Sequence, residues 1–363
     1  MTVDSAAPRR KKPFISANQV TFARLALLPI GCWLLYQGTT GQTVALVFMT
    51  IVGCTDFVDG WLARRYGPTV LGGLMDPIAD KVFIAVTLLP MIDLEWLPYW
   101  VVMLIFLREF VITSARTTYS RRHVTLKTTY LAKVKTWYQM ITGGLIFLLR
   151  ISPASMRWVT LGGMLGPGLI GLIVAFILTK RIWKGGVVFL FSFGALFVIA
   201  WLVPPQPLIL GLAWTTIAIT WASGGVYLFG LRELKGRGLD MDDVIRLFGA
   251  IALPVLACLI LGRRQIAAWP IFITVAIEFA IGGLDNLLAH HELLPSWTGW
   301  AARVVPQAGL LGAALWLERT GHPPQLAFYA TLGAMGVTAI SAAVLFYRQR
   351  DVYLGARADA PIK

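Results

Sequence analysis

The sequence predicts an all-α, polytopic helical membrane protein, and composition, run length and charge placement all favour this class. Of the 363 residues, 57% are hydrophobic and 14% are charged, whereas an ordinary soluble domain has about 25% charged residues. Long apolar runs recur along the chain, while a membrane β-barrel alternates polar and apolar residues in segments of about ten. The composition therefore excludes a soluble globule, a disordered chain and a disulfide scaffold.

Apolar runs long enough to cross a bilayer, which takes roughly 20 residues in a helix, occur along the whole sequence. The twelve predicted spans are 19–37, 42–60, 71–92, 97–116, 133–151, 158–179, 186–203, 207–230, 244–262, 267–289, 299–317 and 325–347.

Basic residues lie before the first run and in alternate loops after it, as at Arg64 and Arg65 or Arg121 and Arg122. By the positive-inside rule, these loops and both termini face the cytoplasm. The net charge of +14 is then explained by topology and by contact with anionic membrane lipids, and not by nucleic acid. We expect a multi-pass protein of a bacterial-type inner (plasma) membrane.

Four aspartates interrupt the apolar background in the second and third runs. Asp56 and Asp59 are three residues apart, and Asp76 and Asp80 are four apart, so on helices each pair shares one face. Small residues such as Gly60 on the same faces would let the two helices approach closely. The sequence therefore predicts that four carboxylates converge near the cytoplasmic ends of two adjacent helices.

Such a cluster indicates a metal site. Each carboxylate costs about 2.5–3.5 kcal/mol at the centre of a membrane, and neighbouring carboxylates repel each other. Divalent cations would offset both effects, and all-oxygen ligands favour hard ions such as Mg²⁺ or Mn²⁺. A carboxylate-bound metal suits displacement at phosphorus.

Two other interpretations use the same aspartates. They could be loop residues paired to Arg64, Arg65 and Lys81, although surface pairing does not need two helix-spaced faces. The protein could also be a cation-coupled membrane transporter, since aspartates within the membrane also mark ion pathways. A transporter would need polar residues to continue toward the far side, where these spans are apolar.

The pattern Asp56-x2-Asp59-Gly60-x2-Ala63-Arg64-x7-Gly72-x3-Asp76-x3-Asp80 resembles the signature of the CDP-alcohol phosphotransferase family, which has eight residues where this chain has seven. Flanking residues resemble in particular its phosphatidylglycerophosphate synthase branch: Asn18-x2-Thr21-x2-Arg24, Arg108-Glu109, Arg116 and Lys133-x-Lys135. The resemblance implies a six-helix membrane core, here in residues 1–180, a homodimer and a site open to the cytoplasm.

The resemblance also implies an activity. The expected enzyme transfers a phosphatidyl group from CDP-diacylglycerol to glycerol 3-phosphate, releases CMP and depends on Mg²⁺ or Mn²⁺. The metal ligands would be Asp56, Asp59, Asp76 and Asp80, with Asp80 also the catalytic base on the acceptor hydroxyl. The nucleotide would lie against Thr21, Asp56, Gly60, Ala63, Arg64 and Gly72.

The acceptor needs a separate argument from charge. Glycerol 3-phosphate is a dianion, so its pocket should be cationic. The candidate phosphate-binding residues are Arg108, Arg116, Lys133 and Lys135. Inositol phosphate would fit the same charge, whereas serine would not need so much. Arg121 and Arg122, in the loop that follows, are interpreted as contacts to anionic lipid.

Residues 181–363 extend beyond the usual length of the family and are predicted to form an additional helical membrane domain of about six helices. One interpretation is an added bundle for packing, dimer contact or lipid access. The alternative is a degenerate repeat, in which Arg246 echoes Arg24 and Asp285 echoes Asp59. Such a repeat would lack three of the four carboxylates and could not run the reaction.

Overall fold

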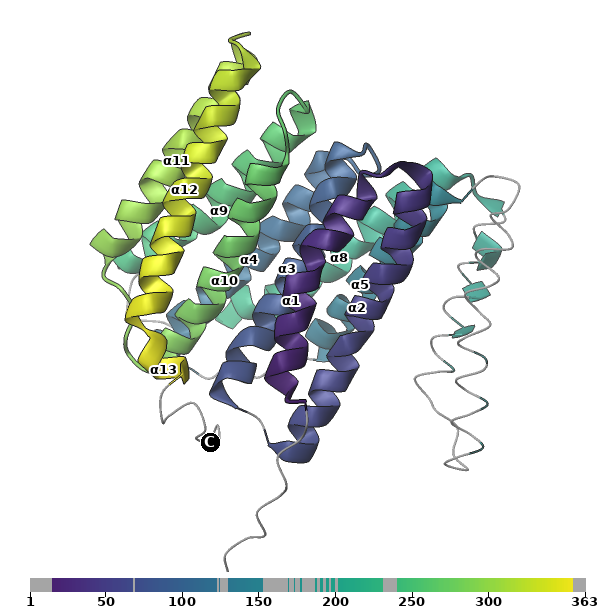
Figure 1. Ribbon diagram of the computed structural model, residues 1–363, viewed down its shortest axis with the longest axis horizontal. Coiled ribbons are helices and arrows are strands. Elements are labelled where there is room, and N and C mark those ends of the chain that lie inside the picture. The colour runs from purple at the N-terminus through teal and green to yellow at the C-terminus, as the bar shows by residue number, and fades with distance from the viewer. Residues whose placement is uncertain are drawn as a thin grey trace, which may run out of the picture.

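The computed structural model describes residues 15–67, 69–122, 124, 130–152, 202–230 and 240–354, with isolated residues between 169 and 199. The described chain is built from long α-helices (Figure 1). In chain order these are α1 (Ala17–Leu35), α2 (Gly38–Tyr66), α3 (Val70–Asp93), α4 (Tyr99–Arg121), α5 (Tyr130–Ile151), α8 (Pro205–Gly230), α9 (Met241–Arg263), α10 (Trp269–His290), α11 (Trp297–Arg319), α12 (Pro324–Arg348) and the short α13 (Arg350–Leu354).

The all-α prediction is confirmed, and ten of the twelve predicted spans correspond to helices α1–α5 and α8–α12. The spans predicted at 158–179 and 186–203 lie largely outside the described residues. Several helices are longer than predicted because their polar ends remain helical. Helix α2, for example, extends to Tyr66, whereas the predicted span ends at 60. Helix α1 keeps the predicted length of 19 residues but begins at Ala17, after a capping box in which Ser16 and Gln19 exchange hydrogen bonds.

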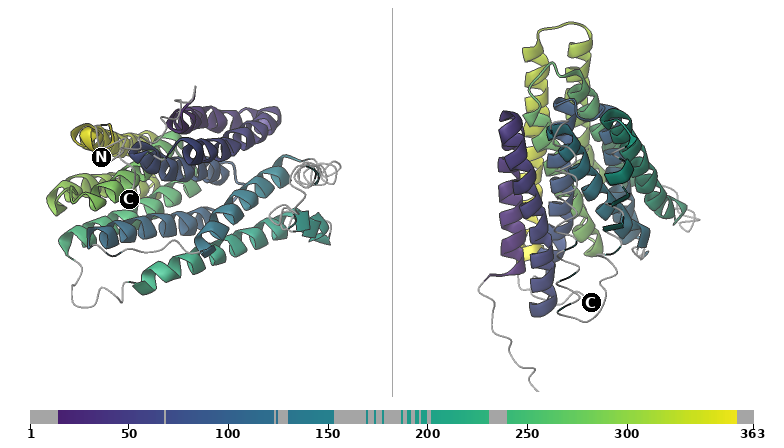
Figure 2. Two further views of the ribbon diagram at one scale, coloured as in Figure 1. Left: turned by 90° about the horizontal axis from the view of Figure 1, so that it is seen from below. Right: turned by 90° about the vertical axis from the view of Figure 1, so that its right-hand side faces the viewer.

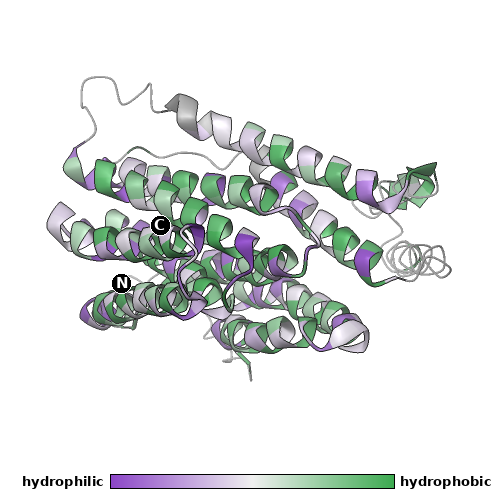
Figure 3. Ribbon diagram, turned by 90° about the horizontal axis from the view of Figure 1, so that it is seen from above, coloured by the Kyte–Doolittle hydropathy of each residue, from purple (hydrophilic) through white to green (hydrophobic). Residues whose placement is uncertain are grey.

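Helices α2, α8, α9, α10 and α12 contain segments long and apolar enough to cross a membrane by composition alone. Helices α3 and α4 are not among them, because the charged residues of the predicted site interrupt their apolar stretches. Large apolar side chains are also exposed on these helices, including Phe22, Trp33, Ile51, Trp214 and Ile340, and hydrophobic residues recur along the helices in Figure 3. Many exposed apolar side chains on helices long enough to cross a bilayer are typical of surfaces that face lipid, so the chain is a membrane protein.

The described helices form one bundle in which the first and second halves of the sequence interleave. Helices α1 and α2 lie on one side, α5 and α8 on the other, and α3 and α4 between them (Figure 2). Helix α4 packs on α8, α9 and α10, and α3 packs on α10. The division into 1–180 and 181–363 stays a prediction, but in this fold the two parts share an extensive interface.

One close helix contact in this interface depends on a glycine. A Cβ added to Gly283 of α10 would lie 2.4 Å from Cγ1 of Ile78 on α3, and real Cβ atoms essentially never come so close. Helix interfaces in membranes use such small residues to bring backbones together. Ile78 lies between Asp76 and Asp80 on α3, so the second half of the chain supports the helix that carries the predicted metal ligands.

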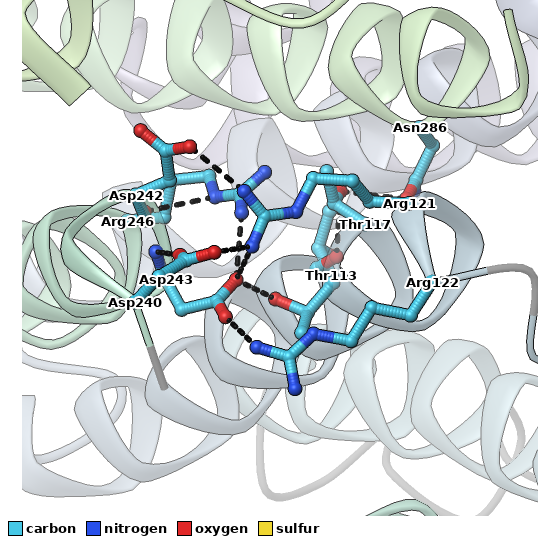
Figure 4. Close-up of polar contacts among 10 residues, drawn as sticks. Thr113, Thr117, Arg121, Arg122, Asp240, Asp242, Asp243, Arg246 and Asn286 are labelled. Carbon is cyan, nitrogen blue, oxygen red and sulfur yellow. Dashed lines mark hydrogen bonds and ion pairs between the residues drawn. The ribbon is translucent and has the colours of Figure 1, made fainter. Parts of the chain in front are cut away.

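A second junction is ionic and joins the end of α4 to the start of α9 (Figure 4). This α4–α9 ionic cluster consists of Arg121, Arg122, Asp240, Asp242, Asp243 and Arg246. Burial would raise the pKa of Asp240, but the Asp243 backbone N–H and the Arg121 guanidinium outweigh burial and lower that pKa below its usual value. Arg121 and Arg122, expected to contact lipid, are thus paired with carboxylates of α9.

Candidate active site

The four aspartates of the predicted metal site do converge. Asp56 and Asp59 lie in the C-terminal part of α2, and Asp76 and Asp80 lie in the first half of α3. These two helix ends meet the N-terminal part of α1, which packs on both α2 and α3. The helical spacings of three and four residues therefore put both carboxylate pairs on the faces that look toward α1, as the periodicity predicts.

The residue at the centre of the cluster is Arg24 of α1. Its Nη1 lies 2.7 Å from Oδ1 of Asp56 and 3.4 Å from Oδ1 of Asp80, and its Nη2 lies 3.5 Å from Oδ2 of Asp59. The Arg24 side chain is only 2% exposed. A buried guanidinium without carboxylates would be very costly, so Arg24 and the aspartates stabilise each other.

Thr21 lies one helical turn before Arg24 and completes the contacts from α1. Its hydroxyl is 3.0 Å from Oδ2 of Asp59 and 3.1 Å from Oδ1 of Asp76. Because a hydroxyl has one hydrogen, it donates to one of these carboxylates at a time. Thr21 is fully buried, so in this structure it orders the carboxylates; it was predicted to contact the nucleotide.

The cluster is buried on one side and open on the other. The Asp59 side chain is 3% exposed, while those of Asp56 and Asp80 are 47% and 46% exposed. In the described part of the chain, no three His, Cys, Asp or Glu side chains are arranged to enclose a metal ion, and Arg24 itself contacts three of the aspartates. The all-carboxylate donor set nevertheless fits a hard divalent cation in its chemistry.

The other predicted nucleotide-binding residues line the same helix ends. A Cβ on Gly72 would lie 2.9 Å from Oδ1 of Asn18, so this glycine lets α1 approach the start of α3. A Cβ on Gly60 would lie 3.4 Å from Nη1 of Arg64, whose side chain turns back over α2 and is exposed. Ala63 is half-buried between them. The small residues Gly60 and Ala63 therefore leave space along this face of α2.

The predicted acceptor residues on α4 and α5 fall into two groups. Arg108 and Lys135 are buried and share one carboxylate: Oε1 of Glu109 lies 3.0 Å from Nη1 of Arg108 and 2.5 Å from Nζ of Lys135. Arg116 is exposed and donates from Nη2 to the hydroxyl of Tyr227 at 2.6 Å. The side chain of Lys133 lies outside the described residues.

The two groups of site residues are linked through α3. Lys81 directly follows Asp80, and its Nζ donates to Oγ1 of Thr113 on α4 at 2.5 Å. Thr113 precedes Arg116 by one helical turn, so the two share a face of α4. The carboxylate cluster and the exposed arginine therefore belong to the same end of the bundle.

Sequence reasoning missed three parts of this arrangement. It noted Arg24 only as part of a flanking motif, although its one-turn spacing from Thr21 was visible. It gave no role to Glu109, whose position next to Arg108 was the available signal. Tyr227 had no signal, since its partner Arg116 lies 111 residues away.

Comparison with known proteins identifies related sequences for the N-terminal part of the chain. The sequence model described as CDP-alcohol phosphatidyltransferase matches residues 14–167. A probable phosphatidylglycerophosphate synthase of Mycobacterium tuberculosis is 36% identical over 137 residues, which are 36% of this chain and 65% of that relative. The chain thus spans just under two thirds of its length.

Two further relatives have similar identity. The CDP-diacylglycerol–glycerol-3-phosphate 3-phosphatidyltransferase of Bacillus subtilis is 30% identical over 145 residues, 36% of this chain and 75% of that protein. A cardiolipin synthase (CMP-forming) of Streptomyces coelicolor is 36% identical over 97 residues, 25% of this chain and 45% of that protein. No solved structure matches the chain significantly.

Proposed function

Because the chain belongs to the CDP-alcohol phosphatidyltransferase family, we propose that it transfers the phosphatidyl group of CDP-diacylglycerol to glycerol 3-phosphate and releases CMP. The observation that carries this proposal is the convergence of four aspartates from α2 and α3 on one turn of α1, where three contact the buried Arg24 and Asp76 accepts from Thr21. The names of the mycobacterial and Bacillus relatives support the choice of substrates.

In this proposal Asp56, Asp59, Asp76 and Asp80 hold a divalent cation, Mg²⁺ or Mn²⁺, at the pyrophosphate of the nucleotide. Such an ion would offset negative charge on the phosphate oxygens. The four carboxylates and Arg24 sum to a formal charge of −3 when all are ionised (four negative, one positive). This excess of negative charge supports the binding of a further cation at the cluster.

Asp80 is proposed as the general base. It takes the proton of the acceptor hydroxyl, whose oxygen forms a bond to the phosphatidyl phosphorus while the bond from that phosphorus to CMP breaks. Its half-exposed side chain supports this role, because a base must come within hydrogen-bond reach of its substrate. The buried Asp59 is less suited to it.

The acceptor phosphate is proposed to bind the cationic residues of α4 and α5, with Arg116 the exposed member among those whose side chains the structure describes. The basic residues in alternate loops, such as Arg64 and Arg65, support a site that faces the cytoplasm of a bacterial-type inner membrane. A homodimer is proposed from the family resemblance alone.

The purified protein, supplied with CDP-diacylglycerol, is expected to release CMP with glycerol 3-phosphate and much more slowly with inositol phosphate or serine. The dianionic acceptor should bind best because the proposed pocket carries guanidinium and ammonium groups. CMP and the lipid product would be quantified by chromatography. Turnover with inositol phosphate or serine alone would assign the protein to another branch, and release of CMP with no acceptor would indicate a hydrolase.

Metal removal is expected to abolish this turnover. After chelation and dialysis, CMP release should fall to background, and Mg²⁺ or Mn²⁺ should restore it while Zn²⁺ should not. The same ions should raise the melting temperature of the wild type, since a ligand that binds only the folded state stabilises it. Full turnover in excess chelator would contradict the proposed ligand set.

A further inference from the structure

Helix α8 lies outside the segment matched by the family, residues 14–167, yet it packs directly on the helices that carry the proposed acceptor residues. Hydrogen bonds connect it to them along its length. Nε1 of Trp221 donates to the Leu104 carbonyl at 3.2 Å, and Nε2 of Gln139 donates to Thr220 at 2.9 Å. In a membrane, such bonds and close packing hold helices together, because lipid supplies no hydrophobic drive between them.

Three residues of α8 lie against the arginines themselves. Nη2 of Arg108 donates to Oγ of Ser223 at 2.8 Å. A Cβ on Gly224 would lie 3.1 Å from Nε of Arg108, so this glycine makes room for the arginine. One turn further along, Tyr227 accepts the hydrogen bond from Arg116.

Tyr227 is buried, and its hydroxyl and ring both contact Arg116. It is 2% exposed, and its backbone carbonyl accepts a hydrogen bond of 2.7 Å from the hydroxyl of the fully buried Tyr119. The Arg116 guanidinium lies 4.7 Å from the centroid of the Tyr227 ring, within the range of a cation–π contact. One tyrosine therefore contributes both a ring face and a hydroxyl to one exposed arginine.

Arg116 differs from its neighbours in what balances its charge. Arg108 and Lys135 both pair with Glu109, which uses much of their capacity to bind an anion. Among the described residues, Arg116 pairs with no carboxylate, and it contacts the neutral Tyr227. A guanidinium that is oriented but not neutralised keeps its remaining donors for a phosphate.

We infer that Tyr227 is a positioning residue that presents Arg116 to the phosphate of the acceptor. Helix α8 thereby sets acceptor affinity from outside the segment that matches the family. This inference rests on the proposed function for the identity of the acceptor, and it gives the additional helices a role in substrate recognition.

The test is Tyr227→Phe, which removes the hydroxyl and keeps the ring. In the full-length protein, the KM for glycerol 3-phosphate should rise about tenfold, equivalent to about 1.4 kcal/mol, while kcat and the KM for CDP-diacylglycerol stay within about twofold. The matched control is Tyr36→Phe, which deletes a tyrosine hydroxyl that donates to Asp93 at 2.9 Å, at the end of α3 away from Asp76 and Asp80. Its kinetic constants should equal those of the wild type.

A double variant separates positioning from general damage. If Tyr227 acts through Arg116, then Arg116→Ala with Tyr227→Phe should raise the KM no more than Arg116→Ala alone, whereas independent effects would multiply. Multiplying effects, an unchanged KM in Tyr227→Phe, or equal changes in kcat and both KM values would each overturn the inference.

Calorimetric titration of glycerol 3-phosphate into the same proteins distinguishes the two proposals. If wild type binds this acceptor, Tyr227→Phe weakens binding and no CMP is released, the inference holds and the proposed function fails. If wild type turns over and the variant binds equally well, the inference alone fails. If wild type neither binds nor turns over, both are overturned.

Discussion

Replacing Asp80 with asparagine is expected to lower the rate of CMP release by roughly a thousandfold, the usual order of a general-base contribution. Asparagine keeps the size of the side chain but cannot accept the proton of the acceptor hydroxyl. The loss should appear in kcat, with the KM for CDP-diacylglycerol changed much less, because three carboxylates and Arg24 remain. Steady-state kinetics with glycerol 3-phosphate as acceptor would measure both constants.

The matched control for this variant is Asp93→Asn. It makes the same change on the same helix, but at the opposite end, where Asp93 accepts a hydrogen bond of 2.9 Å from Tyr36. Turnover should be within about twofold of wild type, since no proposed site residue lies there. Wild-type turnover in Asp80→Asn would remove Asp80 from the base role, and an equal loss in Asp93→Asn would indicate structural damage to α3.

The position of Asp80 explains why it, and not Asp59, should carry this effect. Asp59 is 3% exposed and is held by both Thr21 and Arg24. Asp80 is 46% exposed, and its contact with Nη1 of Arg24 is longer, at 3.4 Å, than the 2.7 Å contact of Asp56. Asp80 thus combines a longer contact to Arg24 than that of Asp56 with an exposure that Asp59 lacks.

Much of this site could be predicted from the sequence because its rules are local. Runs of about 20 apolar residues fix the helices, and the three- and four-residue spacings fix which way Asp56 and Asp80 face. The meeting of these two faces at α1 depends on how the helices pack, and the sequence does not show it directly. The three-residue spacing of Thr21 and Arg24 does place these two residues on one face of α1. Only the helix contacts reveal that Arg24 is the cation at the centre.

The contacts between the two halves could not be predicted in the same way. The acidic stretch Asp240, Asp242 and Asp243 is visible in the sequence as a favourable start for a helix, and Asp240 does cap α9. Nothing local says that Arg121 and Arg122, more than 115 residues earlier, bind this stretch. By composition, basic loop residues suit anionic lipid equally well. Only the tertiary structure shows that these arginines pair with carboxylates of the chain.

Asp243 is the residue on which the α4–α9 ionic cluster depends, and replacing it with asparagine should cost about 3 kcal/mol in free energy of unfolding. Its side chain is 2% exposed and contacts three guanidinium groups, those of Arg121, Arg122 and Arg246. Thr118 also donates to it at 2.8 Å. Asparagine preserves the volume, so the loss would come from leaving positive charge buried without its partner.

Asp242→Asn is the matched control, one residue away in the same turn of α9. Asp242 is 28% exposed and, among the described residues, its carboxylate pairs with one guanidinium, that of Arg121 at 2.7 Å, so its loss should cost less than about 1 kcal/mol. Unfolding in mixed detergent micelles would give both free energies. Equal losses would mean that burial does not set the strength of this junction. A large loss confined to Asp243→Asn would show that α4, which carries Arg108 and Arg116, is anchored by α9, and that the second half of the chain holds the proposed acceptor site in place.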